Sequence, residues 1–168
     1  MNSLRALLVL AGVCLLSAAL AAAASPPKKI TPKGVDGVKL GMTHKELRER
    51  GLVGRLRGGC PLGGDDTRSA RLKRPLRGIV NYTTRRPRRA RDITIRRGGA
   101  ARGVGIGERI ADIRDAFPKA RVNRDTEDTF GITLVRVPRK GGGPLRFAVS
   151  TETRRITLIG VPYIAFCE

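Results

Sequence analysis

The chain has 168 residues, with 34 Lys and Arg against 14 Asp and Glu, and its formal net charge is +20. This length suits one domain with a modest core, which Val, Ile and Leu must build because Trp is absent and Phe and Tyr are few. So large a charge attracts polyanions such as acidic cell-wall polymers, anionic lipid or nucleic acid. The scarcity of aromatic residues argues against base stacking and against sequence-specific recognition of nucleic acid. Only sequence-independent contact with the nucleic-acid backbone remains.

The first 24 residues have the order of a secretory signal peptide. Arg5 supplies a short basic region, residues 6–20 are almost wholly apolar, and four alanines follow as a signal-peptidase site. The alternatives are a transmembrane anchor, for which the apolar run is short, and a lipoprotein signal at Cys14, which lacks the small preceding residue of a lipobox. We expect cleavage before Ser25, a secreted, periplasmic or cell-envelope protein, and no membrane span in the remainder.

The rest of the chain divides into an arm and two repeats. Residues 25–36 are rich in proline and lysine, so we expect a linker or an extended arm there rather than a packed element. The stretches Gly37–Glu49 and Gly103–Asp115 then match each other at a spacing of 66, with glycine, valine and arginine recurring at equivalent positions. This self-similarity predicts two tandem repeats, 37–102 and 103–168.

Each repeat is predicted to contain a glycine turn, a helix and then antiparallel strands. Thr43 and Glu46 have the spacing of a capping box, Gly51 follows the first helix, and Pro118 ends the second. Apolar and alternating runs predict strands at 76–82, 92–96, 131–137, 145–149 and 156–161. Helices followed by β-meanders predict an α+β fold.

Two cysteines, Cys60 and Cys167, remain after signal removal. An even number of cysteines in a small exported domain predicts one disulfide between them, and a reactive thiol is the alternative.

The G-[VI]-x-[LI]-G turn that leads into a helix and antiparallel strands is present twice. In this it resembles the tandem-repeat fold of the β-lactamase inhibitory proteins and the related domain of the small lipoprotein of outer-membrane protein assembly. The resemblance covers Gly37 to Glu168 and implies a domain that binds proteins through the face of its sheet. Inhibition of a β-lactamase is not implied, because the inhibitors use an aromatic concave surface and have disulfides within each repeat, whereas Cys60–Cys167 would link the two.

The segment Arg68–Arg102 is strongly basic, with Asp92 as its one acid. Arg85–Arg89 falls between two predicted strands, so we expect a protruding loop whose guanidinium groups suit phosphate and carboxylate. The alternatives are a solvated charge run and a protein-binding module, of inhibitor or assembly type, that uses its sheet face. We predict a site for an anionic polymer or an acidic protein surface at Arg85, Arg86, Arg88, Arg89, Arg91, Arg96 and Arg97.

No catalytic group, cofactor site or metal site can be assembled from the sequence. Gly103–Gly107 has its third glycine one position early for a dinucleotide motif and is typical of a structural turn. His44 lacks partners for a nucleophile pair with Cys60 or for a metal site, and the acidic cluster Asp125–Asp128 lacks EF-hand spacing for calcium and suits a hairpin turn. We therefore expect a non-catalytic binding domain rather than an enzyme.

Overall fold

A computed structural model describes residues 26–60, 66–140 and 143–166 of the chain. The predicted signal peptide and Cys167 lie outside these residues. Within them, the helices are all too short or too polar to cross a bilayer.

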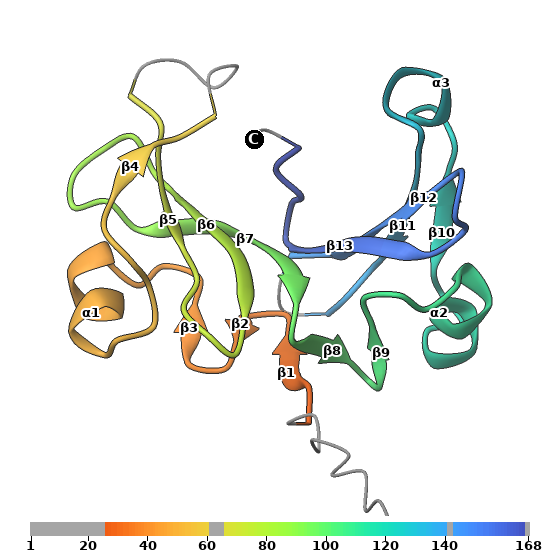
Figure 1. The fold of residues 1–168 in the computed structure, drawn as a ribbon, viewed down its shortest axis with the longest axis horizontal. Coiled ribbons are helices and arrows are strands. Elements are labelled where there is room, and N and C mark those ends of the chain that lie inside the picture. Colours follow the sequence, from red (N-terminus) through yellow and green to blue (C-terminus); the bar gives the residue numbers. More distant parts are fainter. Residues whose placement is uncertain (1–25, 61–65, 141–142, 167–168) are drawn as a thin grey trace, which may run out of the picture.

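The fold is mixed α+β and mostly sheet, as predicted. Eight antiparallel strands form the larger sheet, in the order β10-β11-β12-β13-β7-β6-β5-β4 (Figure 1). Two four-stranded meanders therefore meet edge to edge, with β7 beside β13. The strands are β4 (Arg57–Gly58), β5 (Arg68–Arg71), β6 (Arg77–Tyr82), β7 (Ala90–Arg97), β10 (Arg121–Asn123), β11 (Ile132–Val137), β12 (Leu145–Ser150) and β13 (Ile156–Val161).

A smaller sheet of five short strands contains the region expected to be a linker. Its order is β3 (Val38–Lys39), β2 (Gly34–Val35), β1 (Lys28–Thr31), β8 (Gly99–Ala101) and β9 (Val104–Gly105). The prediction of an unpacked arm is wrong, because β1 is the middle strand, antiparallel to β2 and parallel to β8. Its Ile30 side chain is 3% exposed, so one apolar residue among lysines and prolines anchors the strand in the core.

The helices α1 (His44–Glu49) and α2 (Ile110–Ala116) each follow a glycine turn. Gly37 and Gly103, 66 positions apart, both have φ of +86°, a conformation that strains other residues. Leu47 in α1 and Ile113 in α2 are also 66 apart, and both are fully buried. The two turns therefore share one backbone angle, and each of the two helices buries one apolar residue at the matching position.

The same hydrogen bonds join helix and meander in both halves. The Ala90 N–H donates to the Met42 carbonyl and the Ile156 N–H donates to the Glu108 carbonyl, each at 2.7 Å. An arginine directly precedes Ala90, and another precedes Ile156. The Arg89 guanidinium donates to the Gly41 carbonyl at 2.9 Å, and the Arg155 guanidinium donates to the Gly107 carbonyl at 2.7 Å.

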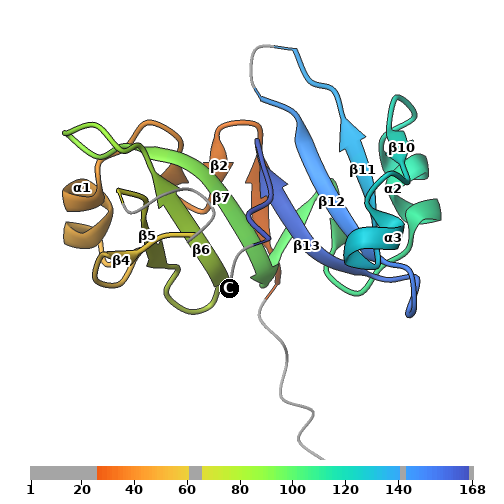
Figure 2. The same ribbon diagram turned by 90° about the horizontal axis from the view of Figure 1, so that it is seen from above.

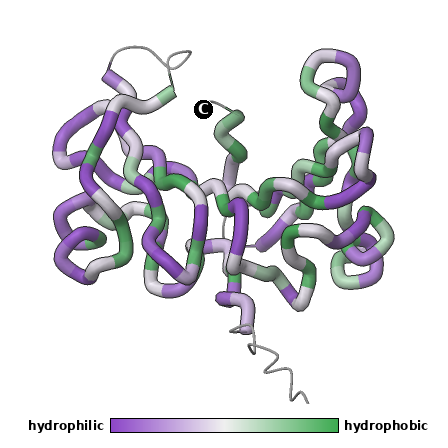
Figure 3. The backbone as a smooth tube through the Cα atoms, viewed as in Figure 1, coloured by the Kyte–Doolittle hydropathy of each residue, from purple (hydrophilic) through white to green (hydrophobic). Residues whose placement is uncertain are grey.

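One hydrophobic core runs through both halves, and the two meanders share it. Ile95 of β7 pairs with Ile159 of β13, and both side chains are fully buried. The larger sheet is strongly twisted (Figure 2), and its two arms curve around the segment that follows β13 (Figure 1). Hydrophobic residues gather on the central strands and at the end of this segment, whereas the outer loops are hydrophilic (Figure 3).

Candidate functional site

The loop of residues 83–89 joins β6 to β7, so the prediction of a loop between two strands is confirmed. Residues 84–87 are all exposed. At this tip, the guanidinium groups of Arg85 and Arg86 make no hydrogen bond or ion pair with any residue that the structure describes.

The base of the loop is held by its other two arginines. The Arg88 guanidinium donates to the Asp66 carbonyl at 2.8 Å, and the Arg89 guanidinium donates to the Gly41 carbonyl. The Thr83 N–H closes the loop by donating to the Arg89 carbonyl at 2.9 Å. Arg88 and Arg89 therefore fix the loop against its surroundings, while Arg85 and Arg86 project from it.

The remaining arginines of the predicted site lie along β7, away from the loop tip. The Arg91 Nε lies 2.9 Å from Asp92 Oδ2, and the buried Asp92 also accepts from Asn81 Nδ2 at 2.6 Å. Arg97 lies opposite Arg77 of β6, at the other end of an eight-residue strand. An extended strand separates its ends by about 3.3 Å per residue, so the seven predicted arginines do not form one surface.

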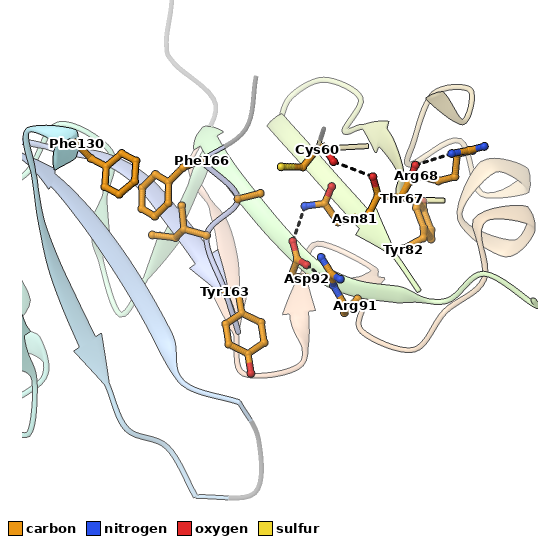
Figure 4. Close-up of a pocket in the computed structure, with 12 residues that line it drawn as sticks. Cys60, Thr67, Arg68, Asn81, Tyr82, Arg91, Asp92, Phe130, Tyr163 and Phe166 are labelled. Atoms are coloured by element: carbon orange, nitrogen blue, oxygen red, sulfur yellow. Dashed lines mark hydrogen bonds and ion pairs between the residues drawn. The ribbon is translucent and has the colours of Figure 1, made fainter. Parts of the chain in front are cut away.

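The concave side of the larger sheet holds a pocket of 550 Å³ (Figure 4). The segment that follows β13 lines this pocket, and the Ala165 N–H ties it to the sheet by donating to Thr94 Oγ1 of β7 at 2.9 Å. The rings of Phe130 and Phe166 stack with centroids 5.8 Å apart, and the Arg146 guanidinium lies 5.0 Å from the Tyr163 ring centroid. The C-terminal segment thus forms part of the concave face.

Three aromatic side chains stand exposed around this pocket: Phe130 at 56%, Tyr163 at 52% and Phe166 at 36%. The small number of aromatic residues in the sequence argues against β-lactamase inhibition, and protein binding through the sheet face is the alternative to the arginine loop. Of the chain's four Phe and two Tyr, these three nevertheless gather there, and the buried Tyr82 lines the same pocket. The signal that would have indicated this is the apolar tail after the last predicted strand, which has no strand partner of its own.

Tyr82 and His44 form a structural pair beneath the α1 end of the sheet. Their rings meet edge to face at 5.5 Å, and His44 Nε2 lies 3.0 Å from the Gly54 carbonyl oxygen. The Tyr82 hydroxyl is buried without a hydrogen-bond partner among the described residues, and burial raises its pKa.

Cys60 lines the concave pocket together with Phe166, the residue before Cys167. Because Cys167 lies outside the described residues, the predicted disulfide stays a prediction. The chain nevertheless brings Cys60 close to the end of the described C-terminal segment.

Polar groups of the glycine turn and of the acidic cluster form bonds with nearby residues of the chain. The Gly105 N–H donates to Glu108 Oε2 at 3.0 Å, so a carboxylate occupies the amide that a phosphate would need. The acidic segment connects the antiparallel neighbours β10 and β11, as expected of a hairpin, and it contains the short helix α3 (Glu127–Phe130). Glu127 accepts from Thr133 Oγ1 and lies 3.9 Å from Arg124.

Comparisons with known proteins assign no function to this site. No family model, curated protein or solved structure matches the chain. The function is therefore argued from the residues and their geometry.

Proposed function

We propose that the protein is an exported, non-catalytic domain that binds anionic polymers through Arg85 and Arg86. The observation that supports this is the structure of loop 83–89, in which Arg88 and Arg89 bind backbone carbonyls and the two tip arginines have no partner among the described residues. The one acid of the basic segment, Asp92, is buried and bonded to Asn81 and so cannot neutralise them. A loop held in this way loses little conformational freedom when it binds an anion.

The ligand class follows from the chemistry of the tip. Guanidinium groups bind phosphate and carboxylate oxygens bidentately, and such contacts do not depend on the order of the monomers in a polymer. Envelope polymers bearing these groups are the nearest polyanions to an exported protein. Loop residues 83–89 include no aromatic side chain, so we expect contact with the charged backbone of the polymer.

The test compares two variants that lose the same charge. Arg85→Gln/Arg86→Gln removes two charges from the tip, and Arg48→Gln/Arg114→Gln removes two from exposed positions on α1 and α2. We expect only the tip variant to weaken binding to inorganic polyphosphate, measured by fluorescence anisotropy, and to flatten its dependence on salt because fewer counterions are released. Equal affinities for the two variants would show that the run is only a solvated face.

A second candidate function is protein binding through the concave face. The exposed rings of Phe130, Tyr163 and Phe166 favour it, because aromatic side chains are enriched at protein interfaces. A partner held there would be retained from an envelope fraction at high salt by the wild type and lost with Phe166→Ala. A partner lost in salt and insensitive to Phe166 would point back to the arginine loop.

We also propose that the two halves are tandem copies of one unit of the β-lactamase inhibitory type. Support comes from the equal φ angles of Gly37 and Gly103, from the buried pair Leu47 and Ile113, and from equivalent hydrogen bonds. The pairing of β7 with β13 sets these halves side by side in one sheet.

Export and the Cys60–Cys167 disulfide complete the proposal. The intact mass of protein recovered outside the cytoplasm tests both, because cleavage before Ser25 and the loss of two hydrogen atoms on oxidation of the two thiols each change it. A mass that includes Met1, or one with both thiols free, would contradict the corresponding part.

A further inference from the structure

A second hollow, of 760 Å³, lies on the α2 side of the molecule, away from the arginine loop and the concave pocket. It is formed by β1, by the residues after α2 and by the end of β11. Its apolar lining comes from Ile30, Phe117, Val137 and three prolines. Its charged lining is wholly basic and consists of Lys29, Arg102, Lys119, Arg139 and Lys140.

Two of these cations converge on one ring. The guanidinium carbons of Arg102 and Arg139 lie 5.3 Å and 5.6 Å from the centroid of Phe117, which is itself 5% exposed. Arg102 is positioned further by donating to the Ala116 carbonyl at 3.2 Å. Burial, and to a smaller extent the charge of Arg102, lowers the pKa of Arg139. Two like charges are thus held together with no carboxylate among the lining residues.

We propose that this hollow binds a single-chain anionic amphiphile, with its headgroup between Arg102 and Arg139 and its apolar tail on the floor around Phe117. The volume lies within the range of about 300–1,000 Å³ typical of small-ligand sites. An anion would relieve the repulsion between the two guanidinium groups, and only an attached apolar tail would also use the floor. A polyanion without an apolar tail would leave the apolar floor of the hollow uncovered.

Among the described residues, the first half of the chain lacks the side chains that form this site. Asp36 stands 66 positions before Arg102, with a similarly positive φ, and it forms an ion pair with Lys28 at 3.4 Å. Gly51 stands at the position equivalent to Phe117, so the ring that receives the guanidinium groups is missing. The hollow therefore depends on side chains found only in the second half, and a similar backbone does not create it by itself.

The experiment measures binding below the critical micelle concentration by isothermal titration calorimetry. Laurate and dodecyl phosphate distinguish a fatty acid from a phosphate-headed lipid, and dodecyltrimethylammonium carries the same tail with the opposite charge. We expect at least one anionic amphiphile to bind, at least about tenfold more tightly than the cationic one or than inorganic sulfate. Equal binding of the cationic amphiphile, or no binding of either anionic one, would overturn the proposal.

Variants then place the ligand. Arg139→Gln should weaken binding of the anionic amphiphile at least about fivefold. Arg97→Gln removes the same charge elsewhere and should leave this binding unchanged. The Arg85→Gln/Arg86→Gln variant should also leave it unchanged. If Arg139→Gln does not fold, Lys119→Gln/Lys140→Gln at the exposed rim replaces it, with thermal melting as the check on folding. The same affinity in the hollow variant and in Arg97→Gln would refute the site while leaving the polymer-binding loop untouched.

Discussion

The segments around Gly37 and Gly103 have similar turns and similarly buried helix residues, but their surface side chains differ. Gly37 and Gly103 turn the chain in the same way, but the residues just before them are Asp36 and Arg102. The N-cap of α1 is Thr43, which caps the helix with its side chain, whereas the N-cap of α2 is Arg109, which makes no side-chain cap hydrogen bond. The comparison shows that turns and buried positions constrain the sequence in both halves, while charge at the surface is free to diverge and to create a site in one half only.

The largest expected effect concerns a position at which the first half requires a glycine and the second half does not. Gly34 has φ of +146°, and a Cβ there would lie 1.9 Å from the Val38 carbonyl oxygen, whereas its counterpart is already Ala100. We expect Gly34→Ala to lower the free energy of unfolding by about 4 kcal/mol, and Ala100→Gly by about 1 kcal/mol. Urea denaturation measures both. A Gly34→Ala variant as stable as the wild type would show that the turn relaxes freely.

Next come the two buried helix residues, at which the halves should behave alike. Leu47 and Ile113 are each fully buried against the shared core. Leu47→Ala and Ile113→Ala should each cost about 3 kcal/mol, because each leaves a cavity of similar size. The same denaturation series tests this, and a difference of more than about 2 kcal/mol would mean that one half packs more loosely than its partner.

A smaller effect separates the helix caps. Thr43 Oγ1 accepts from the Glu46 N–H at 3.2 Å, while Glu46 accepts from the Thr43 N–H at 2.7 Å. In α2 only the second of these bonds has an equivalent, from the Arg109 N–H to Asp112 at 2.7 Å. Thr43→Ala should cost about 1 kcal/mol and Arg109→Ala less than about 0.5 kcal/mol. Equal losses would contradict the asymmetry.

The smallest effect is a dependence on pH in α1. The backbone N–H of Thr43, followed by its hydroxyl, holds the pKa of Glu46 below its ordinary value of 4.5. A lowered pKa in the folded state means that this contribution is complete above pH 4.5 and is lost as the pH falls through the folded-state pKa. Glu46→Gln should therefore flatten the fall of thermal stability on acidification below pH 4.5. An unchanged profile would show that Glu46 plays no part in acid sensitivity.

Much of the fold could be predicted from the sequence because its signals are local. Gly37 and Gly103 mark the turns through their positive φ, and the strand that begins at Leu145 follows from its alternation. Strand β5 was not predicted, because Arg68–Arg71 shows no alternation of apolar and polar residues. Its place in the sheet comes from backbone pairing with β4 and β6. The loop between β6 and β7 was predicted, whereas the carbonyl partners of Arg88 and Arg89 come from distant segments that no local pattern reveals, and the binding role of the loop stays a prediction.

By itself, the sequence determined the net charge, the turn glycines, the helix caps and the order of helix and strands. These features depend on backbone conformation and on contacts between near neighbours, which composition and spacing express directly. Tertiary structure decided that the lysine- and proline-rich β1 becomes the middle of a sheet, that Phe166 joins the concave face, and that Arg102 and Arg139 meet over Phe117. Each of these depends on a partner far along the chain, because hydrogen bonds, burial and charge pairing are satisfied in space rather than in sequence.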